Sequence, residues 1–468
     1  MVSLKMRFFL FILLLLIGKS VAVAAAPFFE VRFSRPLAVY YFVEALSGSS
    51  RSGTVFQKQY IGSRFETAET RAALADFDTL DLQYSYAFPQ YPAFSKTPGQ
   101  TEDLLRRALL LSTDLTDFRQ RAAGIVPKED LTRLLHILTV FKPVYDSMVY
   151  VPLEREFHQQ LSACASRLHT PAVSEFFRKM SLFHGQEEGP ADTFRVAFYP
   201  LPRSRAFQAT AFIDCSVSAL PEGERDYDML LSVTLHEIAH ILYNDQPLAL
   251  KQRLQKAFAN SPFPGAANAR LLFNEAQATA LGNGAAYLAL TGVLDTGAWY
   301  SNKYRNGMAK AIYPMVAGYL SRNQTIDSAF VAEYCRIYAT RFPEWEGEAA
   351  HLFTNRFVVA DDDAALREVR QAFPVTSTSY AATPLNEANL KIISESLLTK
   401  VLVLNPENAG NLALAKRFFP QIRVSPALLQ KGFVRSQNRD GTWLYVLFTR
   451  PHPLRRTLEE TLKEKESH

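Results

Sequence analysis

Apolar residues recur three and four positions apart along much of this chain, the spacing of a helix with one buried face. Up to about residue 185, this pattern predicts helices over Thr101–Ala123, Lys128–Val140, Val144–Leu168 and Thr170–Phe183. Pro127 and Pro171 stand near the starts of two of them, where the first turn of a helix accepts proline. We therefore expect a helical N-terminal domain over residues 26–185.

The pattern changes after the polar segment Gln186–Pro190. Two runs rich in aromatic and β-branched residues then predict strands over Thr193–Tyr199 and Phe207–Val217. The helical spacing returns and predicts helices over Asp228–Tyr243, Leu248–Ala259, Ala266–Leu290, Asn302–Leu320 and Ser328–Arg341. A small sheet followed by helices is an α+β arrangement, and we expect it to form a second domain over residues 186–345.

The signals are mixed in the last part of the chain. They predict a strand over Lys400–Leu404, a helix over Glu407–Phe418, and a hairpin of Phe433–Ser436 with Trp443–Phe448 that turns at Asp440-Gly441. We expect a small α+β module over residues 346–468. The predicted fold class of the whole chain is α+β and predominantly helical.

The first residues have the layout of a secretory signal peptide. Lys5 and Arg7 precede the apolar run Phe8–Gly18, and a stretch of small residues ends at Ala26. The run is well short of the roughly 20 apolar residues that cross a bilayer. We expect removal of residues 1–25 or nearly so, export to the periplasm or out of the cell, and no membrane span in the mature protein.

Composition and charge narrow the function classes. The chain is 48% hydrophobic and 21% charged, which excludes a disordered or collagen-like protein. Three of its five net positive charges lie in the predicted signal peptide, so the body is nearly neutral and lacks the basic surface of a nucleic-acid-binding protein. The cysteines have neither a disulfide-framework nor a CxxC spacing, and small buried thiols are the favoured interpretation of Cys164, Cys215 and Cys335.

The candidate chemistry lies in the predicted helix over Asp228–Tyr243, which contains His236-Glu237-Ile238-Ala239-His240. Residues four apart lie on one helix face, so His236 and His240 are placed to bind one ion together. Glu237 points about 100° away around the helix axis, which suits contact with a metal-bound water. The alternative is a pair of histidines on an amphipathic helix without metal.

A catalytic zinc site needs a third protein ligand and one open position. Glu275, in the segment Asn274–Gly282, is the best downstream candidate. The small residues that follow it would let two helices approach closely enough for a carboxylate to reach the ion. The alternative for Glu275 is a solvated surface glutamate.

Together, the HExxH helix and the Asn274-Glu275-Ala276-Gln277-Ala278 segment resemble the gluzincin zinc metallopeptidases, and the minigluzincins in particular. The resemblance implies a zincin-like core in which Zn²⁺ is held by His236, His240 and Glu275. It implies that Glu237 is the general base for a zinc-activated water, and that the strand Phe207–Val217 pairs with an extended peptide or protein substrate. It also implies an oxyanion-stabilising tyrosine or histidine, for which the chain offers Tyr287, Tyr300, Tyr304, Tyr313 and His184 without a means to choose.

One position departs from the family pattern. Such proteins commonly have an acidic residue four positions after the glutamate ligand, where it braces a histidine, and this chain has Thr279 there. The zinc would then be held less firmly, or another carboxylate would take that role.

The expected function is that of a secreted zinc metallopeptidase, and three alternatives stay open. The first is a zinc hydrolase that acts on non-peptide amides or esters. The second is a secreted binding or scaffold protein with an occluded zinc site. In the third, part of residues 27–185 is a pro-segment that covers the cleft until it is cleaved.

Overall fold

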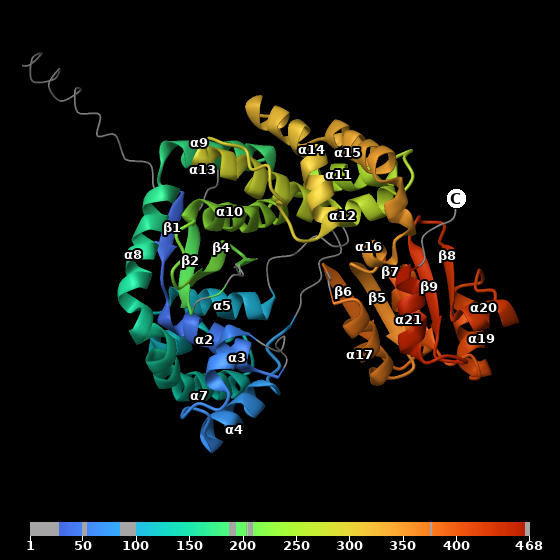
Figure 1. Ribbon diagram of the computed structural model, residues 1–468, viewed down its shortest axis with the longest axis horizontal. Coiled ribbons are helices and arrows are strands. Elements are labelled where there is room, and N and C mark those ends of the chain that lie inside the picture. Colours follow the sequence, from blue (N-terminus) through green and yellow to red (C-terminus); the bar gives the residue numbers. More distant parts are fainter. Residues whose placement is uncertain are drawn as a thin grey trace, which may run out of the picture.

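A computed structural model of the chain describes residues 28–48, 54–84, 100–186, 193–202, 204, 209–374 and 377–463. The predicted signal peptide lies outside these residues. The described residues form a mixed, predominantly helical structure with a four-stranded and a five-stranded sheet (Figure 1). None of their helices is long and apolar enough to cross a membrane.

The four-stranded sheet lies at the centre of the N-terminal two thirds of the chain. Its strands are β1 (Phe29–Arg32), β2 (Phe194–Leu201), β3 (Ala209–Phe212) and β4 (Cys215–Pro221), in the order β1-β2-β4-β3. Strands β1, β2 and β4 are parallel, and β3 runs antiparallel to β4 at the edge of the sheet. Parallel pairing of β1 with β2 brings the start of the described chain beside a segment about 165 residues later.

Helices cover both faces of this sheet. On β2, Phe194, Val196 and Phe198 belong to a first buried cluster, on one face of the sheet. Ala197 and Tyr199 belong to a second buried cluster, on the other face. Side chains alternate in this way because a strand has a period of two residues. The second cluster lies under α2 (Arg35–Leu46), α3 (Val55–Tyr60), α4 (Ala68–Phe77), α5 (Thr101–Leu111), α6 (Leu115–Arg121) and α7 (Lys128–Tyr145). The first lies under α8 (Val151–Leu168), α9 (Pro171–Phe183), α10 (Tyr227–Asn244), α11 (Leu248–Ala259), α12 (Ala266–Thr279), α14 (Lys303–Ser321) and α15 (Ser328–Arg341).

One buried core extends across the predicted boundary between residues 185 and 186. Phe29 of β1, Phe157 of α8 and Phe177 of α9 share one core with Leu235 of α10. This shared core could not be predicted from the sequence, because β1 has only four residues and its partner strand is remote along the chain. Helices α2 to α7 form a layer on a sheet whose other strands, β2, β3 and β4, lie after residue 186.

The described part of the predicted strand Phe207–Val217, which begins at Ala209, contains β3 and the start of β4, and these two strands form a hairpin. Ile213 at the turn has φ 52°, a left-handed conformation that β-branched residues rarely adopt, so the sequence carried no turn signal there. The next residue, Asp214, is held by a two-point ion pair from Arg107 of α5, at 2.7 and 3.0 Å, and by Arg195 of β2. Burial acts to raise the pKa of Asp214, but these bonds and charges outweigh it and lower that pKa.

Several predicted helices have the expected bounds within one or two residues, and three long ones are interrupted. Val144–Leu168 begins at the end of α7, passes through a π-helical turn, η1 (Asp146–Tyr150), and continues as α8. Ala266–Leu290 consists of α12, a second π-helical segment, η2 (Ala280–Ala286), and α13 (Tyr287–Thr291). Thr101–Ala123 is broken at Ser112 between α5 and α6.

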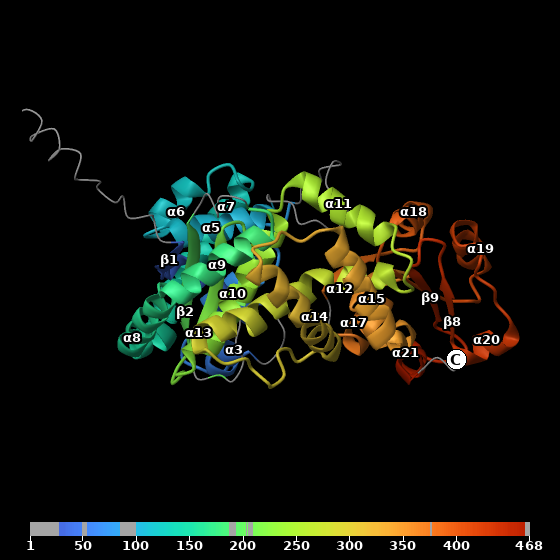
Figure 2. The same cartoon turned by 90° about the horizontal axis from the view of Figure 1, so that it is seen from above.

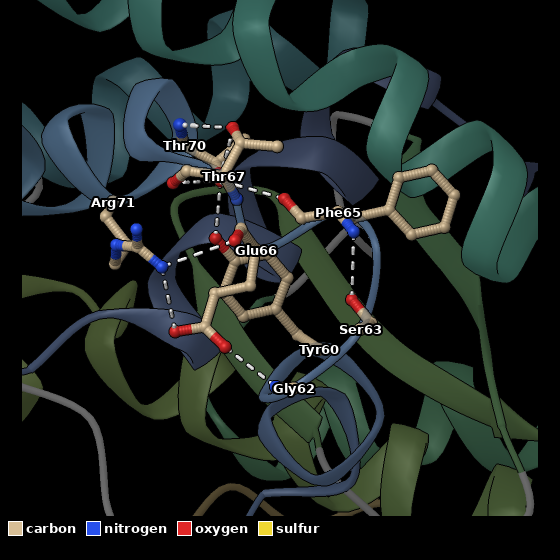
Figure 3. A network of polar contacts seen from close by, with 8 residues as sticks. All are labelled: Tyr60, Gly62, Ser63, Phe65, Glu66, Thr67, Thr70 and Arg71. Carbon is tan, nitrogen blue, oxygen red and sulfur yellow. Dashed lines mark hydrogen bonds and ion pairs between the residues drawn. The ribbon is translucent and has the colours of Figure 1, made fainter.

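A polar network fixes the connection between α3 and α4 in the helical layer below the sheet. Figure 3 shows Tyr60 at the end of α3, whose hydroxyl donates to Oγ1 of Thr70 at 2.7 Å. Thr67 and Thr70 form a capping box at the start of α4, and the amide of Gly62 donates to Glu66 at 2.7 Å. These bonds satisfy the first amides of α4 and join it to the preceding turn.

The C-terminal module begins at α16 (Ala349–Leu352) and contains the second sheet, in the order β6-β5-β7-β9-β8. Its strands are β5 (Asn355–Ala360), β6 (Thr378–Ala382), β7 (Thr399–Leu404), β8 (Phe433–Gln437) and β9 (Trp443–Phe448). One face lies against α17 (Asp363–Ala372) and α21 (Leu454–Lys463), and the other against α18 (Glu387–Glu395), α19 (Ala409–Phe418) and α20 (Pro426–Lys431).

This module differs from the predicted α+β layout, because strands and helices alternate and only β8 is antiparallel. The predicted β8–β9 hairpin is present. Figure 2 shows the module at the end of the molecule opposite α6 and α8. Glu346, in the 3-10 turn η3 (Pro343–Gly347), joins the two parts by accepting bonds from Asn268 of α12, Tyr338 of α15 and Trp443 of β9. The three cysteines are all buried free thiols.

Candidate metal centre

Helix α10 carries the HExxH residues and crosses the first sheet (Figure 1). Its N-terminus is capped by Asp226, whose carboxylate accepts the amide of Met229 at 3.0 Å. Small side chains let it approach the sheet: Ser218 of β4 and Thr234 of α10 lie 3.3 Å apart through their hydroxyl oxygens. His236 and His240 are buried on α10, with 5% and 7% exposure.

Helix α12 and the π-helical segment η2 pack against α10. An added Cβ on Gly282 of η2 would lie 2.4 Å from Cβ of His236 and 2.6 Å from its Cα, so only glycine permits this spacing. Ala276 and Ala278 on α12 are fully buried. The small residues that the sequence placed after Glu275 therefore do bring the two helical segments into close contact.

The structure brings together the three predicted ligand residues. One donor atom each from His236, His240 and Glu275 lies within 4.8 Å of the other two. The Nε2 atoms of the two histidines are 3.1 Å apart. The side chain of Glu275 is 19% exposed, so this residue is not the solvated surface glutamate of the alternative interpretation.

These distances fit a tetrahedral metal. Ligand atoms at 2.0–2.1 Å from a tetrahedral Zn²⁺ lie about 3.3 Å from one another. The histidine pair, at 3.1 Å, already has that separation. The largest separation in the set, 4.8 Å, exceeds it by about 1.5 Å, a movement within reach of a rotation of the Glu275 side chain. Two imidazoles and one carboxylate are a usual donor set for a catalytic zinc with one open position.

An asparagine braces His240, and sequence reasoning missed it. Nδ1 of His240 lies 3.0 Å from Oδ1 of Asn274, and this oxygen also accepts from Nε2 of Gln277 at 3.3 Å. Because the amide oxygen accepts, Nδ1 carries the proton and Nε2 keeps its lone pair for the centre. Thr279, considered for this role from the sequence, is fully buried, and its hydroxyl bonds no described residue.

His236 is held in the neutral form that a metal ligand requires. Burial, assisted by the nearby His240 and Arg305, lowers the pKa of His236 to about 3, while Glu275 and the side chain of Asn283 act in the opposite direction. A neutral imidazole retains the lone pair that binds a cation.

Tyr300 is the member of the oxyanion candidates that lies at this centre. Its ring centroid is 6.2 Å from that of His236, and its hydroxyl accepts from Nη1 of Arg305 at 2.5 Å. Burial and the charge of Glu275 raise the pKa of Tyr300, against the opposing effect of Arg305, and Glu237 adds to the rise. Glu237, half-buried on α10, therefore lies near enough to act on Tyr300.

The other candidates have different surroundings. The Tyr304 hydroxyl donates to Glu348, Tyr313 packs edge-on against Trp299, and His184 shares a hydrogen bond with Gln246. No described contact joins the side chain of Tyr287 to the three ligand residues. The sequence could have pointed to Asn274, which directly precedes Glu275, but nothing in it indicated Arg305.

A cavity of about 350 Å³ lies away from this centre, on the C-terminal module. Its lining includes Lys431 of α20, Phe433 of β8, and Arg456 and Glu460 of α21. It shares no residue with the His236, His240 and Glu275 group.

Comparison with known proteins adds no further assignment. No protein-family model, curated protein or solved structure matches this chain.

Proposed function

We propose that this protein is a secreted zinc metallopeptidase of the gluzincin type. The observation that carries the proposal is the convergence of His236, His240 and Glu275, whose donor atoms lie within 4.8 Å of one another from two packed helical segments. Three protein donors leave a fourth tetrahedral position for water, which favours a catalytic over a closed structural site.

Zinc bound here would lower the pKa of its water to about 7 and polarise a carbonyl group. Glu237 follows His236 directly, is half-buried and acts on the pKa of Tyr300, which supports a role beside the metal and outside the group of three ligands. It would take the proton of the attacking water and pass it to the leaving amine. Tyr300 would donate a hydrogen bond to the carbonyl oxygen as negative charge develops there.

The sheet supports a peptide as the substrate. Strand β3 is an edge strand that contacts α10, and among the described strands it pairs only with β4. The outer backbone groups of an edge strand can pair with an extended peptide. This observation favours peptide bonds over small esters or amides, which need no strand.

The proposal is tested by metal content and hydrolysis together. We expect about one zinc per chain by elemental analysis in wild type and in Glu237→Gln, since glutamine removes only the base. Cleavage of a fluorescence-quenched peptide library should be lost in Glu237→Gln and in wild type treated with a zinc chelator. Removal of a general base costs at least 10²-fold.

Glu333→Gln is the matched control, because Glu333 lies on the exposed face of α15 and pairs with Arg336. It should keep both zinc and cleavage. Turnover that persists in Glu237→Gln, or wild type without zinc, would contradict the proposal.

A further inference from the structure

A buried cation lies beside the candidate metal centre. Arg305 of α14 is only 6% exposed, and burial of a guanidinium group is costly unless partners compensate it. Its partners belong to the centre: Tyr300, in the loop before α14, and Glu275 of α12.

One nitrogen of Arg305 faces both partners. Nη1 donates to the Tyr300 oxygen at 2.5 Å and lies 3.7 Å from Oε2 of Glu275. The guanidinium carbon is 4.9 Å from the centre of the Tyr300 ring. Arg305 thus fixes both the position of the phenol oxygen and the plane of the ring that carries it.

This bond decides what the Tyr300 hydroxyl can do. A phenol has one hydrogen to donate and two lone pairs. Because one lone pair accepts from Arg305, the hydrogen is directed elsewhere, and no described residue accepts it. A positive neighbour on the oxygen also strengthens the hydroxyl as a donor.

We propose that Arg305 is a positioning residue that presents the Tyr300 hydroxyl to an oxygen atom of a carbonyl-containing ligand at the metal centre. The inference rests on the proposed function and deepens it. Arg305 acts through Tyr300 and does not itself bind the ligand, because its side chain is buried and already engaged by Tyr300 and Glu275.

The test uses the full chain loaded with Co²⁺, whose visible absorption reports ligand binding at the metal, and acetohydroxamate as the probe. The variants are Tyr300→Phe, Arg305→Met and the double variant. We expect each single variant to weaken acetohydroxamate binding about 10-fold, the scale reported for partners that orient a metal site. The double variant should be no weaker than the poorer single variant, because both changes remove one interaction.

Tyr313→Phe is the matched control, since Tyr313 also belongs to α14 but packs against Trp299, and its acetohydroxamate affinity should equal that of wild type. Losses that multiply, to about 100-fold in the double variant, would show independent roles and overturn the positioning of Tyr300 by Arg305. Failure of the wild-type Co²⁺ protein to bind the probe would overturn it as well.

A second set of variants covers the case in which Arg305→Met does not fold. Arg305→Lys combined with Tyr300→Phe then gives the same comparison, and Arg305→Lys alone should recover part of the affinity. This comparison of single and double variants measures probe binding and needs no peptide hydrolysis. A protein that binds metal and probe with non-additive losses but cleaves no peptide therefore supports the inference and contradicts the proposed function.

Discussion

Asn274 shows how one residue can replace a missing carboxylate. The resemblance led us to expect an acid at the position of Thr279, yet Nδ1 of His240 still has a partner, the amide oxygen of the residue just before Glu275. A neutral amide fixes the tautomer and the ring orientation of a histidine, as a carboxylate does, but raises its basicity less.

Loss of this brace should weaken metal binding. We expect Asn274→Ala to lower zinc affinity about 10–100-fold, the usual cost of losing the partner of a histidine ligand. Asn274→Asp should bind at least as tightly as wild type, because a carboxylate makes the stronger acceptor. Competition with a chromophoric zinc chelator measures both.

Thr279→Ala is the control that separates the two candidate braces. Its hydroxyl bonds no described residue, so zinc affinity should stay within about two-fold of wild type. A large loss in Thr279→Ala together with none in Asn274→Ala would reverse the assignment.

At the scale of elements, the π-helical segment η2 sets the distance between α10 and the helix that carries Glu275. A π turn inside an α-helix often lies at a functional site, since the inserted residue changes which side chains face the neighbouring element. Here it directs Gly282 at His236 and Gly284 at Tyr313 and Trp299.

Gly282→Ala should therefore damage both stability and the centre. The new Cβ would meet backbone and Cβ atoms of His236 at 2.4–2.8 Å, and neither group can move without shifting α10. Overpacking of this kind costs about 1–3 kcal/mol. Urea unfolding should show that loss in the metal-free protein, and zinc affinity should fall as well.

Gly318→Ala, on α14, is the corresponding control. There the nearest atom is the end of the flexible Arg322 side chain at 3.2 Å, so stability should be unchanged or rise by up to about 1 kcal/mol. Equal losses of stability in the two variants would mean that the close α10–η2 contact is not the cause of the loss in Gly282→Ala.

In the molecule as a whole, the junction between the part that contains the first sheet and the C-terminal module contains a buried histidine. Nε2 of His351 in α16 lies 2.8 Å from the Tyr338 hydroxyl of α15, and its ring is 4.6 Å from that of Tyr304. Burial lowers the pKa of His351 to about 4, although Glu348 acts against that effect.

This shift makes stability depend on pH in a defined direction. Between about pH 6.5 and pH 4 the unfolded chain binds a proton at His351 that the folded chain does not. The contribution of His351 is thus fully present above pH 6.5 and is lost as the pH falls toward 4, by up to about 3 kcal/mol.

His351→Gln keeps a hydrogen-bonding side chain that does not titrate. We expect its free energy of unfolding to fall less than that of wild type between pH 7 and pH 5, as measured by urea unfolding with a chelator present. The exposed His136 of α7 gives the control, since His136→Gln should follow the wild-type pH dependence. If the free energy of unfolding of His351→Gln falls as much as that of wild type over this range, His351 is not the source of the pH dependence.

Many of the helices and the three candidate metal ligands could be predicted from local sequence alone. Local spacing fixes a helix and the face on which residues four apart lie, so the helix over Asp228–Tyr243, its two histidines and the small residues after Glu275 were readable without a fold. The C-terminal hairpin was readable for the same reason, because Asp440-Gly441 is a local turn signal.

The contacts between those elements could be known only from the fold. The pairing of β1 with β2, the turn at Ile213, and the contact of Arg305 with Tyr300 and Glu275 join segments through packing that leaves no periodic trace in the sequence. A four-residue strand or a buried cation is stable only with partners that are remote in the sequence. In an HExxH helix, by contrast, the helical spacing alone puts the two histidines on one face.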